Sequence, residues 1–444
     1  MALIRLVKNI PGLALNDKND RQKLLKVILP SFFIHFIAAL LTVFTFLLLT
    51  RKLGAREYGI LTYSFTVITL IASLCTSGIN IMTLRESAAL LATGKIELWK
   101  GFYRWSSRLV LFICIALPLL IAACILMGTY YFHIAALVSS PYTFPILYAV
   151  VAIPFYCFMN YYSAWLRSQH KTVLSFLPDN IIKPVFFLVL LICFFQFNIW
   201  NAVLARDISF IAAFIFIAIV FFRTTKMEGI KPQYNSVVWK SSLKSLLLLT
   251  LLSSLNSKLD ILLLGFFKDA SQVGIYSGAD RIAVSIAIFQ VMMNQISTAS
   301  ISRLHALNDR EKLQKLITKI TRGVTLMSFP LFLVIVFCGK WVLSFLGPAF
   351  VHGQTALTII AIGQFISIAF GPLGNFSITT KNEKVTILFA FLKMIVIVLL
   401  NFIFTPIWGI TGTAIATAAS MVFSSTGMYI VIKKRTGLST WVLG

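Results

Sequence analysis

Twelve apolar stretches, each about twenty residues long, fill most of this chain, and the segments between them are too short to hold a folded domain. A helix of about 20 mostly apolar residues can cross the ~30 Å hydrocarbon core of a bilayer. The composition agrees, because 59% of the residues are hydrophobic and only 12% are charged, a balance foreign to soluble domains. The sequence therefore predicts an integral membrane protein.

The stretches are taken as membrane spans. They cover residues 27–50, 58–80, 109–129, 142–166, 172–197, 200–222, 245–266, 272–299, 324–346, 354–378, 385–404 and 408–432. Inside lipid every backbone N–H and C=O needs a partner, and the period-2 pattern of a membrane barrel is absent. We therefore expect an all-α bundle of twelve transmembrane helices.

The distribution of basic residues explains the net charge of +25. If the N-terminus is cytoplasmic, only ten of the 39 Lys and Arg lie outside cytoplasmic segments. Five lie near external loops (Arg51, Lys52, Arg56, Lys268, Lys340) and five within spans (Lys183, Arg206, Lys258, Arg281, Lys393). This is the positive-inside pattern. It predicts cytoplasmic N- and C-termini and contact with anionic lipids, and it argues against nucleic-acid binding.

Several chemistries are not expected. All six cysteines fall within predicted spans, and no two have the spacing of metal ligands, so we expect neither disulfides nor a metal site. No phosphate-binding G-x-x-x-x-G-K-[ST] loop and no catalytic cluster in an external loop occur. We expect a carrier, not an enzyme, with no cofactor beyond a proton or sodium ion that drives transport.

The two halves of the chain resemble each other. Gly59 matches Gly274 at an offset of 215 residues, and each opens the second predicted span of its half. Lys171 and Lys384 precede the fifth spans, and Ile199-Trp200 and Ile407-Trp408 open the sixth. Because six is even, the halves are parallel repeats, which predicts two six-helix lobes around a central cavity.

The predicted organisation has five parts. These are a cytoplasmic segment 1–26, an N-lobe 27–222 with spans 1–6, a basic cytoplasmic linker 223–244, a C-lobe 245–432 with spans 7–12, and a cytoplasmic tail 433–444.

Polar side chains recur at helical spacing in two spans. Span 2 contains Thr66, Thr69, Ser73, Thr76, Ser77 and Asn80, and span 7 contains Ser253, Asn256, Ser257 and Asp260. Such stripes line cavities or pack helices together through small polar residues. The sequence leaves both interpretations open.

Charged residues within spans are costly unless they are paired or hydrated, so each is a functional candidate. Asp179 and Lys183 are spaced for an i,i+4 ion pair. Lys393 follows Lys183 by 210 residues, so the two lysines hold nearly equivalent places in the two lobes. Facing lysines near mid-membrane would suit a phosphate group.

The remaining charges lie in spans 7 and 8. Asp260 and Arg281 are predicted at similar depth, so they are candidates to pair. Lys258 and Asp260 would point about 200° apart on one helix, which places Asp260 with Asn256 on the cavity face. We take Lys183, Arg281, Lys393 and Lys258 as candidate substrate contacts, and Asp179, Asp260, Asp280 and Asn256 as candidates for cavity lining or ion coupling. Structural ion pairs are the alternative for each.

Three segments carry a family resemblance. LTRKLGAREYGI (Leu49 to Ile60), VGIYSGADRIA (Val273 to Ala283) and GITGTAIATAAS (Gly409 to Ser420) resemble the oligosaccharide flippases, which transport O-antigen and capsule repeat units. These flippases belong to the multidrug, oligosaccharidyl-lipid and polysaccharide exporter superfamily. The likeness extends along essentially the whole chain in length, span number and order of motifs.

The resemblance implies a substrate and a place of action. The substrate would be a polyprenyl diphosphate carrying an oligosaccharide, moved from the inner to the outer leaflet of the bacterial inner membrane. Arg281 looks like an arginine position of the lipid-linked members, whereas the neighbouring acids depart from a purely cationic cavity. Glycan polymerase and other assembly proteins are implied partners. The alternatives are a cation-coupled multidrug exporter of the same superfamily and a lipid scramblase or assembly scaffold.

Overall fold

The computed structural model is helical nearly throughout. It describes residues 18–442 except 77, 132–139, 170, 194–197, 226–228, 230, 308 and 381. Most of the predicted segment 1–26, the end of the tail and Ser77 thus lie outside the described residues. Within those residues there is no strand, so the predicted all-α fold is confirmed.

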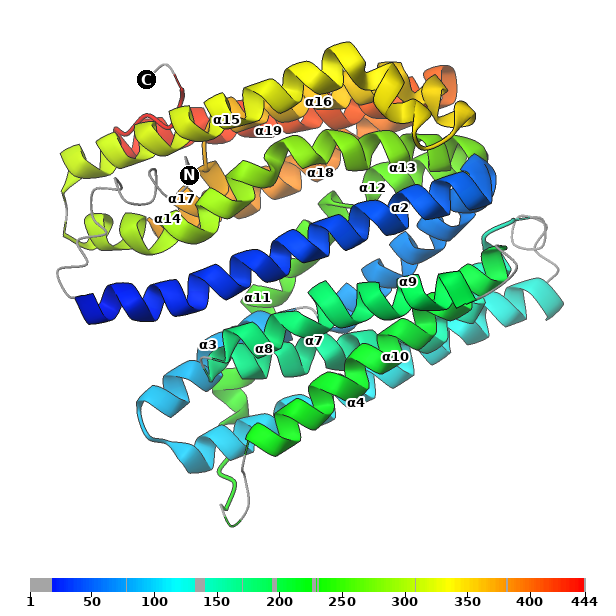
Figure 1. Cartoon of the computed structure of the whole chain (residues 1–444). Coiled ribbons are helices and arrows are strands. Elements are labelled where there is room, and N and C mark those ends of the chain that lie inside the picture. Colours follow the sequence, from blue (N-terminus) through cyan, green and yellow to red (C-terminus); the bar gives the residue numbers. More distant parts are fainter. Residues whose placement is uncertain are drawn as a thin grey trace. The chain divides into compact units, whose positions relative to one another are not determined.

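The chain divides into two compact units, which we call the N-unit (Gln22–Lys258) and the C-unit (Leu259–Gly444, with the start of α2 up to Arg21). The helices of the N-unit are α2 (Lys18–Cys75), α3 (Ile79–Ala92), α4 (Ile96–Leu126), η1 (Met127–Tyr131), α6 (Thr143–Ala149), η2 (Val150–Ala152), α7 (Ile153–Ser168), α8 (Thr172–Leu177), η3 (Pro178–Ile182), α9 (Lys183–Cys193), α10 (Ile199–Thr224) and α11 (Ser236–Asn256) (Figure 1).

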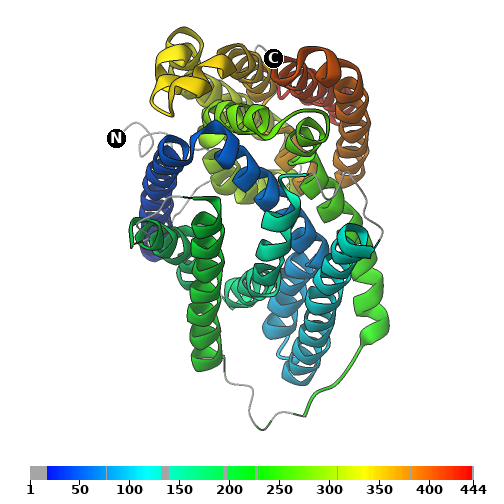
Figure 2. The same cartoon turned by 90° about the vertical axis from the view of Figure 1, so that its right-hand side faces the viewer.

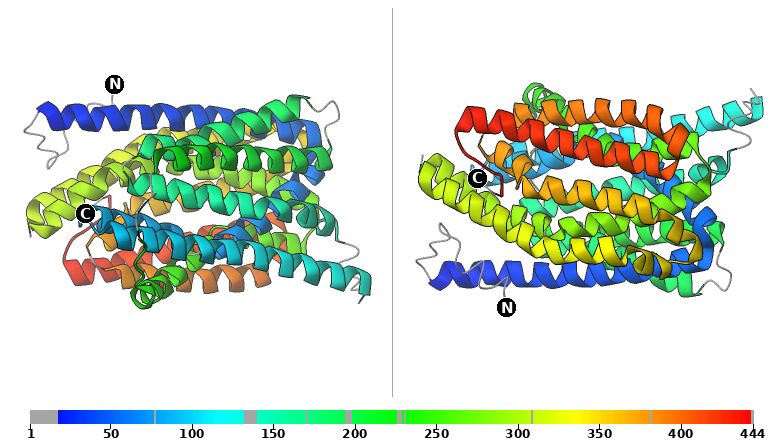
Figure 3. Two further views of the ribbon diagram at one scale, coloured as in Figure 1. Left: turned by 90° about the horizontal axis from the view of Figure 1, so that it is seen from below. Right: turned by 90° about the horizontal axis from the view of Figure 1, so that it is seen from above.

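The C-unit follows. Its helices are α12 (Leu259–Phe267), α13 (Ala270–Val284), η4 (Ser285–Ala287), α14 (Ile288–Ala306), α15 (Arg310–Ser344), η5 (Pro348–Gly353), α16 (Gln354–Ala369), α17 (Leu373–Thr379), α18 (Glu383–Trp408) and α19 (Ile410–Thr436). Helices α18 and α19 run side by side, and α16 packs between α15 and α19 (Figure 3).

The predicted spans correspond closely to these helices. Among the described residues, eleven helical segments are long and apolar enough to cross a membrane. One of them, Ile37–Ala92, covers the second predicted span and residues 37–50 of the first, and each of the other ten overlaps one predicted span. Spans 1 and 2 are merged because the turn between them is a single kink at Gly54, with φ 73° and ψ 175°.

Helix α11 is anchored in the N-unit by aromatic packing. The ring of Trp239 in α11 lies 5.4 Å from Phe102 and 5.5 Å from Trp105 in α4. Just before α11, the chain runs without helix over residues 231–235 (Figure 2), and Gln233 N donates to Glu97 O at 3.0 Å. The close approach requires glycine at Gly101, where a Cβ would lie 1.6 Å from the Gln233 carbonyl oxygen. Helix α11 begins at Ser236, so residues 236–244 of the predicted linker 223–244 are helical.

One predicted landmark of the repeat is wrong. Ile407 and Trp408 do not open the twelfth span; they end α18, and Gly409, with φ 55°, turns the chain into α19. Their counterparts Ile199 and Trp200 do begin α10. An apolar-aromatic pair at a membrane boundary fits the last turn of one helix as well as the first turn of the next, so sequence cannot separate the two.

Candidate functional site

The N-unit holds a charged cluster where the predicted fifth span departs from α-helical geometry. Pro178 lacks an N–H and cannot make the bond to the preceding turn, and a single π turn, η3, begins at this residue. Asp179 lies in that turn, and its carboxylate is hydrogen-bonded to the Lys183 ammonium in the first turn of α9. The predicted i,i+4 ion pair is thus confirmed. Turns of this kind are frequent at functional sites.

Aromatic rings complete this cluster. The Arg206 guanidinium carbon in α10 lies 3.5 Å from the centre of the Phe65 ring in α2 and 5.6 Å from that of Phe210. The Lys183 Nζ lies 5.4 Å from the same Phe210 ring. Cations over ring faces are attracted by the ring quadrupole, most strongly where water is excluded. Two cations therefore share one aromatic platform, which we call the N-unit cluster: Asp179, Lys183, Arg206, Phe65 and Phe210.

The C-unit holds a second cluster, built on four helices. Tyr276 of α13 is fully buried, and its hydroxyl donates to Asp260 Oδ2 of α12 at 2.9 Å. The same hydroxyl lies 3.0 Å from Thr417 Oγ1 of α19. Because the tyrosine has one proton and gives it to the carboxylate, the threonine donates to the tyrosine. The result is a directed chain of hydrogen bonds from Thr417 to Tyr276 to Asp260.

A lysine accompanies this chain. Lys393 in α18 is half-buried and interacts electrostatically with the carboxylates of Asp260 and Asp280. We call Asp260, Tyr276, Thr417, Lys393 and Asp280 the C-unit cluster. Of the two lysines at equivalent places in the repeat, Lys183 is thus ion-paired with a carboxylate, and Lys393 is attracted by the charges of two carboxylates of its own unit.

The other predicted site residues are less enclosed. Arg281 follows Asp280 on α13 and is exposed. Lys258 is half-buried and lies in the two-residue break between α11 and α12. Asn256, the last residue of α11, is half-buried and donates through Nδ2 to Leu252 O at 2.9 Å.

The predicted common face of span 7 is wrong. The prediction assumed one continuous helix, but the helix breaks at Ser257 and Lys258, so Asp260 lies in the first turn of a new helix. Angles counted along a single helix do not apply across this break. Asp260 is 7% exposed and belongs to the C-unit cluster, whereas Asn256 lies in the N-unit.

The polar stripe of span 2 makes local hydrogen bonds. Thr66, Thr69 and Thr76 donate to carbonyls four residues earlier, at 2.8, 2.7 and 3.0 Å, and Ser73 donates three residues back. Hydroxyls satisfied within their own helix need no water-filled cavity. These contacts fit the packing interpretation.

Sequence spacing missed one cluster. The thiols of Cys75, Cys114 and Cys157, from α2, α4 and α7, lie within 4.8 Å of one another and are buried. They are 39 and 43 residues apart along the chain, so no short motif marks them. The thiols have close backbone neighbours: Cys157 Sγ lies 3.6 Å from Ala72 O and Cys75 Sγ lies 3.9 Å from Ile113 O.

Solved structures of other proteins share the fold of this chain. A multidrug resistance transporter of the MOP superfamily, in an inward-facing conformation, has a TM-score of 0.74 at 13% identity, over 90% of this chain and 94% of that one. The lipid II flippase MurJ has a TM-score of 0.68 at 14% identity, over 91% and 87%. At such identities the likeness concerns the fold alone, which this chain shares with these two transporters.

The sequence comparisons go further. The chain belongs to the polysaccharide biosynthesis protein family, whose model matches residues 24–298. A probable flippase, AglR of the archaeon Haloferax volcanii, is 27% identical over 179 residues, which are 38% of this chain and 36% of the relative. The matched part thus spans about a third of that protein. The predicted family is confirmed, and the chain is a multi-pass membrane protein of it.

Proposed function

We propose that the protein is a flippase that moves a polyprenyl-diphosphate-linked oligosaccharide from the inner to the outer leaflet of the bacterial inner membrane by alternating access. Family membership and the flippase name of its relative support this proposal. The observation that carries it is a lysine near carboxylates inside the spans of each unit: Lys183 is ion-paired with Asp179, and Lys393 is attracted by the charges of Asp260 and Asp280. The O-antigen or capsule repeat unit is the proposed cargo.

The pairing suits a phosphate ligand for electrostatic reasons. A carboxylate keeps the ammonium charged in a poorly hydrated site while no substrate is bound. A diphosphate carries more negative charge than one carboxylate, so it attracts the same ammonium more strongly at equal distance. The side chain of Asp179 is 51% exposed, so the pair at Lys183 is accessible and a phosphate oxygen can share the lysine.

The test uses a strain that lacks this protein and makes a surface glycan. Lys183→Ala, Arg281→Ala and Lys393→Ala are each expected to reduce surface glycan and to increase the lipid-linked precursor, measured by mass spectrometry. Lys340→Ala is the matched control, because this exposed lysine lies near the end of α15 and belongs to neither cluster. All variants must reach the membrane at wild-type abundance.

Two outcomes would contradict the proposal at different levels. Normal glycan in all three variants would eliminate charge capture by these residues but leave the flippase function standing. Unchanged glycan and precursor in the deletion strain, with no second flippase present, would eliminate the function itself.

One observation favours a second candidate, a cation-coupled multidrug exporter. Asp260 is buried and held by Tyr276 within a fold that resembles a multidrug transporter. Proton or sodium coupling through Asp260 predicts that Asp260→Asn abolishes drug efflux driven by an ion gradient in proteoliposomes. Efflux of cationic dyes by the wild-type protein, with normal glycan in the deletion strain, would favour this candidate.

A further inference from the structure

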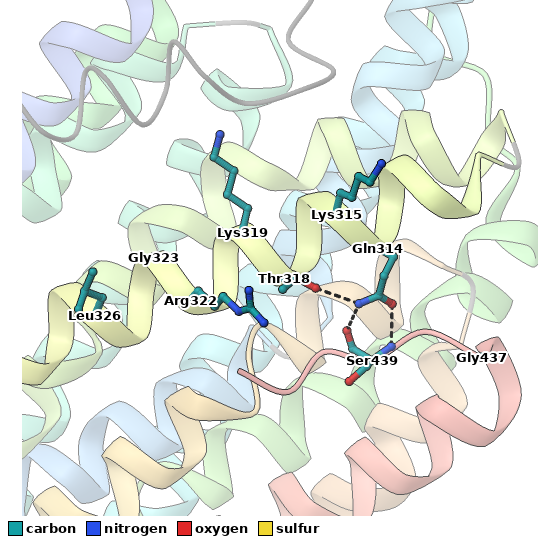
Figure 4. A pocket seen from close by; sticks show the side chains of 9 residues that line it. All are labelled: Gln314, Lys315, Thr318, Lys319, Arg322, Gly323, Leu326, Gly437 and Ser439. Atoms are coloured by element: carbon teal, nitrogen blue, oxygen red, sulfur yellow. Dashed lines mark hydrogen bonds between the residues drawn. The ribbon is translucent and has the colours of Figure 1, made fainter. Parts of the chain in front are cut away.

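A pocket of about 840 Å³ lies in the C-unit, between α15 and the chain that follows α19 (Figure 4). Seven residues of α15 between Gln314 and Leu326 form one wall, and Gly437 and Ser439 form the other. The pocket belongs to neither charged cluster.

The α15 wall is strongly basic. Lys315, Lys319 and Arg322 are spaced by four and three residues, so they lie on one face of the helix, and all three are exposed. The opposite face of α15, with Leu316 and Ile320, is buried. Among the described lining residues there is no acid; Glu311, one turn earlier, pairs with Lys315 through a short contact. The pocket therefore attracts an anion.

The second wall is held firmly. Gln314 binds the backbone of Ser439 at both ends of its amide: Nε2 donates to Ser439 O at 2.7 Å and Oε1 accepts from Ser439 N at 2.8 Å. Arg322 Nε donates to Val442 O at 3.0 Å, and Val442 N donates to Ala369 O at 3.0 Å. We call residues 437–442 the C-terminal strap. These hydrogen bonds fix the position of the C-terminal strap against α15, so the strap forms a defined wall of the pocket.

Aromatic packing supports the strap from beneath. The Trp441 ring lies 4.4 Å from the Phe370 ring and 6.3 Å from the Tyr429 ring, and Thr440, the preceding residue of the strap, is fully buried. The backbone of Gly371 packs closely against the strap: its φ is 81°, and a Cβ at this position would lie 2.7 Å from Thr440 O.

The pocket changes character along α15. Beyond Arg322 its lining is Gly323 and Leu326, and the leucine is 74% exposed. The predicted ninth span begins at Val324, so we expect this apolar end to meet the hydrocarbon and the basic end to meet the headgroups. A ligand that fits carries a phosphate at one end and an acyl chain at the other.

We propose that this pocket binds an anionic phospholipid of the cytoplasmic leaflet. Its phosphate contacts Lys319 and Arg322, its acyl chain lies over Gly323 and Leu326, and the bound lipid fastens the C-terminal strap to α15. The leaflet follows from the predicted orientation of the chain. The inference is independent of the proposed transport activity.

The experiment measures lipid retained by the purified full-length protein, by native mass spectrometry, during titration with phosphatidylglycerol or phosphatidylcholine. The wild-type protein is expected to retain one phosphatidylglycerol in preference to phosphatidylcholine. Lys319→Gln with Arg322→Gln should weaken retention by about fivefold per removed charge. The α4 control, Lys95→Gln with Arg104→Gln, removes one exposed charge just before α4 and one within it, and it should leave retention unchanged.

A further variant separates charge from anchoring. Gln314→Ala loses the bonds to Ser439 but keeps every charge, so it should loosen the strap and lower retention less than the double variant. Equal retention of the two lipids, or equal losses in the α4 control, would overturn the proposal. So would displacement of the lipid by millimolar inorganic phosphate, which would assign the site to free phosphate, or by an equimolar polyprenyl phosphate, which would assign it to the carrier lipid.

Discussion

At the scale of single residues, the hydroxyl of Tyr276 has the clearest energetic role in the C-unit cluster. Its hydrogen bond to Thr417 joins two of the segments that carry the family resemblance, since Tyr276 lies in VGIYSGADRIA and Thr417 in GITGTAIATAAS. It also donates to the buried Asp260 carboxylate. A buried acceptor that loses its donor retains its full desolvation cost.

Replacement of this hydroxyl tests the role. Tyr276→Phe is expected to lower the free energy of unfolding by about 1–3 kcal/mol, because both hydrogen bonds vanish while the ring stays. Thermal unfolding in detergent measures it. Tyr148→Phe removes a hydroxyl from a side chain that is 53% exposed and should change little. Equal stability of the two variants would contradict the prediction, because it would mean that other donors replace the hydrogen bonds of the Tyr276 hydroxyl.

Lys183 offers a test that separates a structural role from a binding role. If the lysine only balances Asp179, removal of both charges restores what removal of one destroys. We expect the opposite: Lys183→Gln lowers surface glycan, and the double variant Asp179→Asn with Lys183→Gln remains equally defective. Recovery of glycan in the double variant to the level of Asp179→Asn alone would make the pair purely structural.

Residue-scale predictions from sequence succeeded where the geometry was local. The Asp179–Lys183 pair follows from four-residue spacing on one helix, and it was predicted. The Phe65 ring under Arg206 and the Tyr276 donor to Asp260 come from separate helices. Sequence spacing carries no information about such contacts, because any of many aromatic or hydroxyl residues in neighbouring spans would satisfy the same charge.

At the scale of helices, the turn at Gly54 decides how the first two spans connect. Its φ of 73° and ψ of 175° fall in a region that is essentially restricted to glycine. A Cβ there would meet nothing within 4 Å, so strain in the backbone is the only obstacle to another residue.

Gly54→Ala is therefore expected to cost about 1–3 kcal/mol of stability, measured by thermal unfolding. Gly374→Ala is the matched control, because its Cβ would also meet nothing within 4 Å and its φ is not positive. A cost in the control as large as that at Gly54 would mean that loss of glycine, and not the dihedral angle, is responsible.

Helix existence was predictable from apolar runs, but helix breaks were not. The break at Ser257 and Lys258 and the π turn from Pro178 to Ile182 lie within runs that read as continuous spans. Hydropathy averages over about nineteen residues, whereas a break involves two to five. Transporter sites are often built at broken helices, and both charged clusters include residues at one: Asp179 lies in η3 and Lys183 follows it, and Asp260 lies in the first turn of α12.

At the scale of the whole molecule, the orientation in the membrane rests on the distribution of Lys and Arg. Residues 303–322 at the start of α15 contain six of these cations, whereas residues 345–353 after it contain none. The positive-inside rule places the first segment in the cytoplasm and the second outside. The same rule assigns the basic pocket to the cytoplasmic leaflet.

Fusions to alkaline phosphatase, which is active only outside the cytoplasm, test this orientation. Fusion after Gly347 is expected to be active, and fusion after Asp309 inactive, because the two sites flank the single long helix α15. Fusion after Arg435 should also be inactive, since the tail has the same sidedness as Asp309. Activity at Asp309 and Arg435 but not at Gly347 would invert the protein, move the pocket to the outer leaflet and reverse the direction in which each unit meets the substrate.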